Sequence, residues 1–299
     1  MSNRLFYTNG NYDIIEEEYI KPEITNKEIE VKSIFTGVCR SDIDMYKGLF
    51  QLLPKNIQGH EGLGIVTKVG KSIRYAKEGD YVATRGEPAF ADYYNCNEYM
   101  FVKVPEADPK YIIEPVACGI NIARGLKIET DDPILLLGSG FLSTIIFTMM
   151  RRYYSNQIFV VGRANEDFWS KQENIIHLNY IPEALPKFKY IIDVSDKPEY
   201  LDMNLYAECA QVILAAEKHP PAILTFGNFL WNAVNVKFPS PRNYGFLDAM
   251  VLGRDLIEEK LLKTSSLWTK AYDRNTEVKL AFEEGSFRPV GYSRGYIKW

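Results

Sequence analysis

The stretch D-D-P-I-L-L-L-G-S-G-F-L-S, residues Asp131–Ser143, contains a short apolar run, a turn with two glycines and the beginning of a helix-like segment. That segment continues as T-I-I-F-T-M-M-R-R-Y-Y over residues 144–154. A strand covered by helices on both faces has a nearly continuous apolar sequence. We therefore predict a strand, a tight turn and a helix here, which form the first unit of a parallel α/β sheet.

Further short apolar runs follow along the chain. They are Gln157–Arg163, Ile175–Leu178 and Tyr190–Val194. Helix-like stretches separate several of these runs, and the longest covers Glu199–Lys218. Apolar strands that alternate with helices indicate a doubly wound parallel sheet of the α/β class.

The chain before residue 122 has a different pattern. Apolar and polar residues alternate in E-I-E-V-K-S-I-F, residues Glu28–Phe35, and in G-L-G-I-V-T-K-V-G, residues Gly62–Gly70. This alternation fits strands with one buried face. The sequence therefore predicts a β-rich unit ahead of the parallel sheet.

Composition and charge exclude several classes of function. The formal net charge of −4 and the absence of a Lys/Arg block argue against nucleic acid as a partner. No apolar run approaches the roughly 20 residues of a membrane-spanning helix, so no membrane partner is expected. The N-terminus lacks the apolar stretch of a signal peptide, and the four cysteines have no paired spacing. We therefore expect a cytoplasmic protein without a disulfide framework.

Two short motifs combine residues that bind metals. They are T-G-V-C-R-S-D, residues Thr36–Asp42, and G-H-E-G-L-G, residues Gly59–Gly64. Thiolate, imidazole and carboxylate are ligands that a catalytic zinc uses while one position stays open. Taken singly, Cys39 could be a small buried residue and His60 a core histidine. The chain has only three histidines, and one lies in this pattern, so the combination favours a metal site.

These motifs occur in a recognisable order with E-G-D-Y-V-A, E-P-V-A-C-G-I-N-I-A and G-S-G-F-L-S. In this order and register they resemble the medium-chain dehydrogenase/reductase superfamily, the zinc-dependent alcohol and polyol dehydrogenases, over nearly the whole chain. The resemblance implies a GroES-like β-rich catalytic domain of residues 1–122 with 241–299. It also implies a Rossmann dinucleotide-binding domain of residues 123–240, and a homodimer paired through the Rossmann sheets is common among such proteins.

The resemblance also implies roles for individual residues. Cys39, His60 and Glu61 match the catalytic zinc ligands of the polyol dehydrogenases. Glu114 occupies the place of a ligating cysteine of alcohol dehydrogenases, where a glutamate binds the metal directly or through water. Ser41 matches a proton-relay hydroxyl.

Three departures or additions qualify this picture. Arg40 matches a residue that touches the cofactor pyrophosphate in some members. The relay histidine of some alcohol dehydrogenases is replaced by Asp44, which leaves the route of the proton open. The four-cysteine lobe of a structural zinc is absent, because few residues separate Val82 from the A-F-A-D-Y-Y segment. We therefore expect one catalytic zinc per chain and no structural zinc.

The glycine turn predicts the cofactor site. Its backbone N–H groups precede a helix and could hold a pyrophosphate, although Ser143 replaces the third glycine of the usual turn, and an ordinary tight turn is the alternative. The second strand ends in V-V-G-R-A-N, with Arg163 and no acidic residue, which favours NADP(H) over NAD(H). A plain surface arginine is the competing interpretation. The expected cofactor contacts are Arg40, Gly138, Gly140, Phe141, Leu142 and Arg163.

A narrower resemblance concerns the second half. The segments at 158–168, 175–190 and 292–299 look like those of ribulose-5-phosphate reductases, which supply ribitol phosphate for teichoic-acid and capsule synthesis. This implies reduction of a sugar or sugar-phosphate ketone to an alditol. A phosphate would need a basic residue, for which the candidates are Arg85, Arg242 and Arg294. The alternatives are a general alcohol or polyol dehydrogenase, a zinc-free quinone or enoyl reductase, and a non-catalytic nucleotide-binding or scaffold protein.

Overall fold

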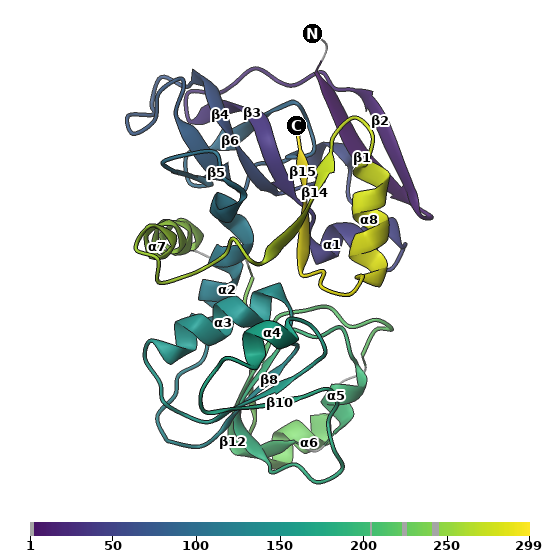
Figure 1. The fold of residues 1–299 in the computed structure, drawn as a ribbon, viewed down its shortest axis with the longest axis vertical. Coiled ribbons are helices and arrows are strands. Elements are labelled where there is room, and N and C mark those ends of the chain that lie inside the picture. The colour runs from purple at the N-terminus through teal and green to yellow at the C-terminus, as the bar shows by residue number, and fades with distance from the viewer. Residues whose placement is uncertain (1–2, 204, 223–225, 241–244) are drawn as a thin grey trace. The chain divides into compact units, whose positions relative to one another are not determined.

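Figure 1 shows a computed structural model of the chain, which describes residues 3–203, 205–222, 226–240 and 245–299. The chain divides into a first unit, Met1–Ala117 with Gly245–Trp299, and a second unit, Cys118–Tyr244. The domain boundaries expected from the sequence, near residues 122 and 241, lie a few residues from these bounds. None of the helices in the described ranges is long and apolar enough to cross a bilayer.

The second unit is built on a parallel sheet whose described strands follow the order β10-β9-β8-β11-β12-β13. The strands are β8 (Ile134–Leu137), β9 (Ile158–Val161), β10 (Ile175–Leu178), β11 (Phe188–Asp193), β12 (Tyr206–Leu214) and β13 (Asn235–Lys237). Leu137 of β8 lies opposite Val161 of β9 and Asp193 of β11. Strands β9 and β10 lie on one side of β8, and β11, β12 and β13 lie on the other. The strand order therefore reverses at β8, which makes the carboxyl end of β8 the topological switch point.

Helices cover both faces of this sheet. They are α2 (Glu114–Arg124), α3 (Phe141–Arg151), α4 (Glu166–Trp169), α5 (Glu199–Asp202) and α6 (Phe226–Trp231). Ile134 and Leu136 of β8 pack with Ile146 of α3 on one face, and Leu135 packs with Leu201 of α5 on the other. The predicted doubly wound parallel sheet is confirmed.

The prediction of a helix over Glu199–Lys218 is wrong. Helix α5 ends at Asp202, and strand β12 begins at Tyr206. Ala and Glu in this stretch favour a helix, but Val212, Ile213 and Leu214 are buried and pair in register with β11. Burial of the Val-Ile-Leu run against the sheet outweighs the local helix propensity.

The first unit is β-rich, as expected. Its larger sheet follows the order β14-β15-β3-β4-β5-β7, with β6 paired to β3, and β1 and β2 form a separate hairpin among the described residues. The strands are β1 (Arg4–Gly10), β2 (Asp13–Glu18), β3 (Glu28–Gly37), β4 (Glu61–Val69), β5 (Tyr81–Thr84), β6 (Tyr93–Asn97), β7 (Phe101–Lys103), β14 (Trp268–Asp273) and β15 (Arg294–Lys298). The helices are α1 (Arg40–Tyr46), η1 (Lys55–Ile57), η2 (Pro109–Tyr111), α7 (Phe246–Glu258) and α8 (Val278–Phe287).

The last strand returns to the middle of the first unit (Figure 1). Strand β15 runs antiparallel to β3, with Tyr296 opposite Gly37, and the Val38 N–H donates to the carbonyl of Gly295 at 3.2 Å. This pairing brings the start of β15 beside the end of β3, where the cysteine motif begins. Residues at the two ends of the sequence therefore build one site.

Candidate active site

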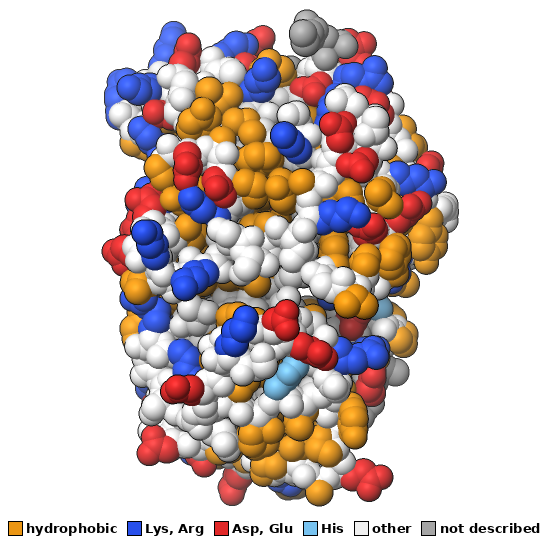
Figure 2. Space-filling model, viewed as in Figure 1, with side chains coloured by type: hydrophobic (Ala, Val, Ile, Leu, Met, Phe, Trp, Pro, Cys, Tyr) orange, Lys and Arg blue, Asp and Glu red, His pale blue; other side chains and the backbone are white. Residues whose placement is uncertain are grey.

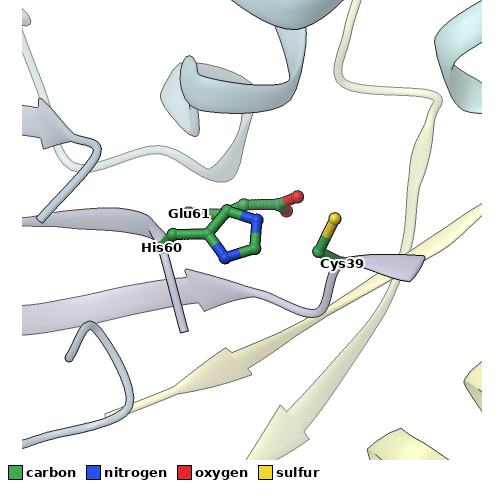
Figure 3. A group of neighbouring side chains, drawn as sticks. All are labelled: Cys39, His60 and Glu61. Atoms are coloured by element: carbon green, nitrogen blue, oxygen red, sulfur yellow. The ribbon is translucent and has the colours of Figure 1, made fainter. Parts of the chain in front are cut away.

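The strand pairing of the first unit brings Cys39, His60 and Glu61 together. Cys39 follows β3 and caps α1, while His60 directly precedes β4 and Glu61 is its first residue. Glu61 lies opposite Gly37 in the β3–β4 ladder, so the two motifs meet although they are separate in sequence. One sulfur, one ring nitrogen and one carboxylate oxygen lie within 4.8 Å of one another (Figure 3). The spacing and chemistry of these three atoms suit a zinc ion.

Electrostatics at His60 also favour a cation. Burial lowers the pKa of the His60 ring, but the charges of Cys39 and Asp42 raise that pKa well above its usual value. Acidic neighbours therefore stabilise positive charge at this ring. The same negative charges would stabilise a bound metal ion, with the neutral imidazole of His60 as one of its ligands.

Asp42 is a buried acidic neighbour of Cys39 and His60. Its carboxylate is 1% exposed, and Oδ2 accepts a hydrogen bond from the Cys39 N–H at 2.9 Å. Burial raises the pKa of Asp42 to about 6. Oδ1 has no hydrogen-bond partner within the described structure, and the charge of this carboxylate is among those that raise the pKa of His60. The spacing of Asp42 from Cys39 is that of a helix-capping pair, which is the signal in the sequence for its place beside Cys39.

Each of the two glutamates at the site faces a buried arginine. Glu61 is 0% exposed, and both of its oxygens contact the guanidinium of Arg294, with Oε2 accepting from Nε at 3.2 Å. Glu114, at the start of α2, is 2% exposed, and its Oε1 lies 3.5 Å from Nε of Arg85. The oxygens of Glu114 are not part of the set within 4.8 Å.

The three basic candidates for a substrate phosphate therefore differ. Arg85 and Arg294 both belong to the candidate metal site, where they neutralise carboxylates. Arg242 lies outside the described residues. Sequence reasoning named the two arginines but could not pair them with Glu114 and Glu61, because each pair joins distant parts of the chain.

Gly37 leaves space for the Glu61 carboxylate. A Cβ atom at Gly37 would collide with Oε2 of Glu61 and would come within 2.9 Å of the Trp268 ring. The lack of a side chain at this position therefore allows Glu61 to reach Arg294 and the metal-binding set. This requirement was not visible in the sequence.

The remaining predicted residues of the first unit lie on α1. Ser41 is half-buried in the first turn of the helix, one residue away from Arg40. Nε of Arg40 donates to both oxygens of Asp44, at 2.8 and 3.0 Å. Arg40 is thus bound within its own helix, and the roles expected for Ser41 and Arg40 remain predictions.

The predicted glycine turn joins β8 to α3 in the second unit. Gly138 has a φ of +112°, which favours glycine, and Gly140 caps the helix that begins with Phe141. Oγ of Ser139 accepts from the Ala164 N–H at 2.8 Å, and its carbonyl accepts from the indole N–H of Trp169 at 2.9 Å. The turn is therefore fixed against the end of β9.

Arg163 lies in the loop directly after β9 and is exposed. The neighbouring Gly162 carbonyl lies 2.8 Å from Nε2 of His177. A hollow of about 560 Å³ opens beside the end of β10, lined by Glu166 of α4, by Ser170 and by His177–Tyr180 among others.

Comparison with known proteins places both units. Residues 25–106 match the family described as alcohol dehydrogenase GroES-like domain. The probable D-xylulose reductase A of Aspergillus clavatus is 23% identical over 262 residues, which cover 75% of this chain and 71% of that protein. The sorbitol dehydrogenase of Rattus norvegicus is 25% identical over 195 residues, 53% of this chain and 55% of that protein.

A solved structure shows the same fold. S. aureus TarJ in complex with NADPH has a TM-score of 0.79 and 19% sequence identity, and the match covers 100% of this chain and 99% of TarJ. At this identity the likeness concerns the fold alone. The GroES-like match lies in the unit that holds Cys39 and His60, and the likeness of fold extends over the parallel sheet of the second unit. These findings together support the resemblance of the chain to the medium-chain dehydrogenase/reductase superfamily.

Proposed function

We propose that the protein is a zinc-dependent NADP(H) oxidoreductase that reduces a ketone of a sugar or sugar phosphate to an alditol. The observation that carries this proposal is the convergence of sulfur, nitrogen and oxygen donors from Cys39, His60 and Glu61 within 4.8 Å. Two sequence relatives, a probable xylulose reductase and a sorbitol dehydrogenase, act by their names on polyols and ketoses. This supports the polyol and sugar class of substrate.

Cys39, His60 and Glu61 would hold the zinc, with Glu114 as a fourth group that acts directly or through water. When bound, zinc would supply a Lewis acid for the carbonyl oxygen of the substrate. One zinc per chain is part of the proposal, because residues 85–92 contain no cysteine that could form a structural zinc lobe.

The chain's own residues would manage the proton and the charge. Ser41 would donate its hydroxyl proton to the oxygen that develops negative charge as hydride arrives from the nicotinamide. The guanidinium groups of Arg294 and Arg85 would supply counter-charges to the two buried carboxyl groups at the proposed metal site. Asp44, which replaces a relay histidine, is already bound to Arg40, so the onward route of the proton would differ from that of the alcohol dehydrogenases.

The cofactor would bind to the second unit. The N–H groups at Gly140, Phe141 and Leu142 begin α3, where the helix dipole favours a pyrophosphate, and Gly138 lets the backbone turn toward it. The exposed guanidinium of Arg163 would bind the 2′-phosphate of NADP(H). S. aureus TarJ, whose fold is similar, has been solved in complex with NADPH, which supports this choice.

The substrate proposal has a finer form, in which ribulose 5-phosphate is reduced to ribitol 5-phosphate for cell-surface polysaccharide precursors. The resemblance of the segments at 158–168, 175–190 and 292–299 to ribulose-5-phosphate reductases supports this form. We also infer that the enzyme acts on a small molecule and forms a homodimer. We infer that it works in the cytoplasm, since its four cysteines are free thiols. The named alternatives are a general polyol dehydrogenase and a non-catalytic nucleotide-binding protein.

One experiment separates these functions. The zinc-loaded protein is incubated with NADPH and a panel of ketoses, ketose phosphates and simple ketones, beginning with ribulose 5-phosphate, and loss of NADPH absorbance is followed. We expect turnover of ketoses that disappears in the Cys39→Ser variant. Equal rates for simple ketones would indicate a general alcohol dehydrogenase, and NADPH binding without turnover of any compound would indicate a binding protein.

A further inference from the structure

One residue, Ser139, connects the glycine turn to the loop that carries Arg163. Ser139 stands between Gly138 and Gly140 in the turn that joins β8 to α3, and it is 3% exposed. The Arg163 loop, residues 162–165, joins β9 to α4. In the proposed function, the turn holds the pyrophosphate and Arg163 the 2′-phosphate of the same cofactor. The contacts of Ser139 therefore affect how the two phosphate-binding groups are spaced.

Both polar groups of Ser139 are directed to this loop and to the helix that follows it. Its Oγ accepts a hydrogen bond from the Ala164 N–H at 2.8 Å. Its carbonyl oxygen accepts from Nδ2 of Asn165 at 3.2 Å and from the indole N–H of Trp169 at 2.9 Å. The hydroxyl is thus bonded to the residue that directly follows Arg163.

The residue that directly precedes Arg163 packs against Ser139 as well. A Cβ atom at Gly162 would come within 2.5 Å of Oγ of Ser139 and within 2.9 Å of its backbone nitrogen. Gly162 has a φ of +152°, which favours glycine, and its N–H donates to the Leu178 carbonyl at 2.8 Å. The backbone of Arg163 is therefore held on both sides, by packing at Gly162 and by a hydrogen bond at Ala164.

The donors on the helix side are fixed in turn. Trp169 is 0% exposed, and its ring lies edge-on to that of Phe147 in α3, with 5.4 Å between the ring centroids. Such packing holds the indole in one orientation, so its N–H stays directed at the Ser139 carbonyl. Asn165 caps α4 in the left-handed conformation, with a φ of +55°. Ser139 thus ties the Arg163 loop to the packed core of the second unit.

The Arg163 side chain leaves this fixed backbone and is exposed. Acidic side chains share its surroundings. Burial and nearby carboxylates, first that of Glu199, raise the pKa of Tyr200 in α5, while the charge of Arg163 lowers it. A guanidinium on a mobile loop can pair with such a carboxylate instead of a phosphate. A fixed backbone limits this choice, and a group held in place before binding loses less freedom when the ligand arrives.

We propose that Ser139 is a positioning residue, which fixes the Arg163 loop on the glycine turn and thereby gives Arg163 its selectivity for the 2′-phosphate of NADP(H). This inference rests on the proposed cofactor and names a further residue that determines its choice. The nucleotide itself sets the distance from the pyrophosphate to the 2′-phosphate. A turn and a loop joined by Ser139 can therefore receive both groups without a rearrangement. In this role Ser139 acts through the loop backbone and does not contact the 2′-phosphate.

The test is a mutant cycle read by the binding of two nucleotides to the full chain. Wild type, Ser139→Ala, Arg163→Ala and the double variant are titrated with adenosine 2′,5′-bisphosphate and with adenosine 5′-monophosphate in a calorimeter. These ligands differ only in the 2′-phosphate, and neither carries the nicotinamide that would approach the proposed metal. Thr148→Ala is the matched control, because it removes a hydroxyl that bonds the Thr144 carbonyl at 2.8 Å within α3.

We expect the wild type to bind the bisphosphate more tightly than the monophosphate. Ser139→Ala should reduce this ratio of affinities about tenfold and leave the affinity for the monophosphate nearly unchanged, a coupling of ordinary size for residues joined through one backbone segment. In the Arg163→Ala background, Ser139→Ala should not change the ratio, because no guanidinium remains to be positioned. Thr148→Ala should not change it in either background.

Equal losses of affinity for the two nucleotides in Ser139→Ala would overturn the inference, because a purely structural role of Ser139 predicts that result. A reduced ratio that persists in the Arg163→Ala background would contradict it as well. If Ser139→Ala fails to fold, Asn165→Gly decides the question, since glycine accepts the left-handed backbone and only the bond to the Ser139 carbonyl is lost. The ratio should fall in this variant too, and an unchanged ratio would refute the inference. Equal affinity of the wild type for both nucleotides would refute the proposed NADP(H) preference itself, which is a different failure.

Discussion

Removal of the Arg294 guanidinium should destabilise the metal-free protein strongly. Glu61 is 0% exposed and Arg294 is 13% exposed by side chain, and both carboxylate oxygens contact the guanidinium. Arg294→Met leaves a fully buried carboxylate without its counter-charge. Loss of one partner of a buried ion pair costs about 3–5 kcal/mol of unfolding free energy. For a unit of this size, that corresponds to a melting temperature about 6–20 °C lower.

The assay is thermal and urea unfolding in the presence of a chelator. The double variant Arg294→Met with Glu61→Gln should recover part of the loss, because it no longer buries a charge. Lys270→Met serves as the control, since its pair with Glu284 at 2.6 Å is 41% exposed on the lysine side and should contribute at most about 1 kcal/mol. If Arg294→Met unfolds like the control, the argument that Arg294 stabilises a charged Glu61 is wrong.

Four further substitutions test other parts of the structure. Cys39→Ser and His60→Ala should each weaken zinc binding at least about tenfold, by chelator competition, with unchanged far-UV circular dichroism, and retained turnover in a metal-free variant would refute the mechanism. Arg163→Ala should weaken NADPH binding about 10- to 100-fold in fluorescence titrations and leave NADH nearly unaffected, since the lost bond is charge-assisted; equal losses would contradict the cofactor assignment. Lys218→Met should cost about 3–5 kcal/mol in urea unfolding, because Asp193, 1% exposed by side chain and 2.7 Å from Nζ, loses its counter-charge; a loss under about 1 kcal/mol would show that water reaches this carboxylate.

The parallel sheet of the second unit could be predicted where the sequence pattern was local. The apolar run before Gly138 and the helix after it gave β8, the turn and α3, because both features depend on neighbouring residues. Strand β12 could not be predicted in this way. Its first half contains helix-forming residues, and only its place next to β11 decides its structure.

The metal site shows the same division. The cysteine and histidine motifs predicted a metal site, because few other roles need a cysteine, a histidine and a glutamate together. The arginine partners did not, since Arg294 lies 233 residues from Glu61 in sequence and reaches it only after β15 pairs with β3. The need for a glycine at position 37 likewise becomes clear only in the folded structure, where Trp268 and Glu61 pack against it.

The most direct test of the proposed function is the metal content of the protein purified without chelator, measured by elemental analysis together with NADPH and NADH titrations. We expect about one zinc per chain, lost in His60→Ala, and tighter binding of NADPH than of NADH. Absence of stoichiometric zinc in the wild type, or zinc retained after loss of His60, would contradict it.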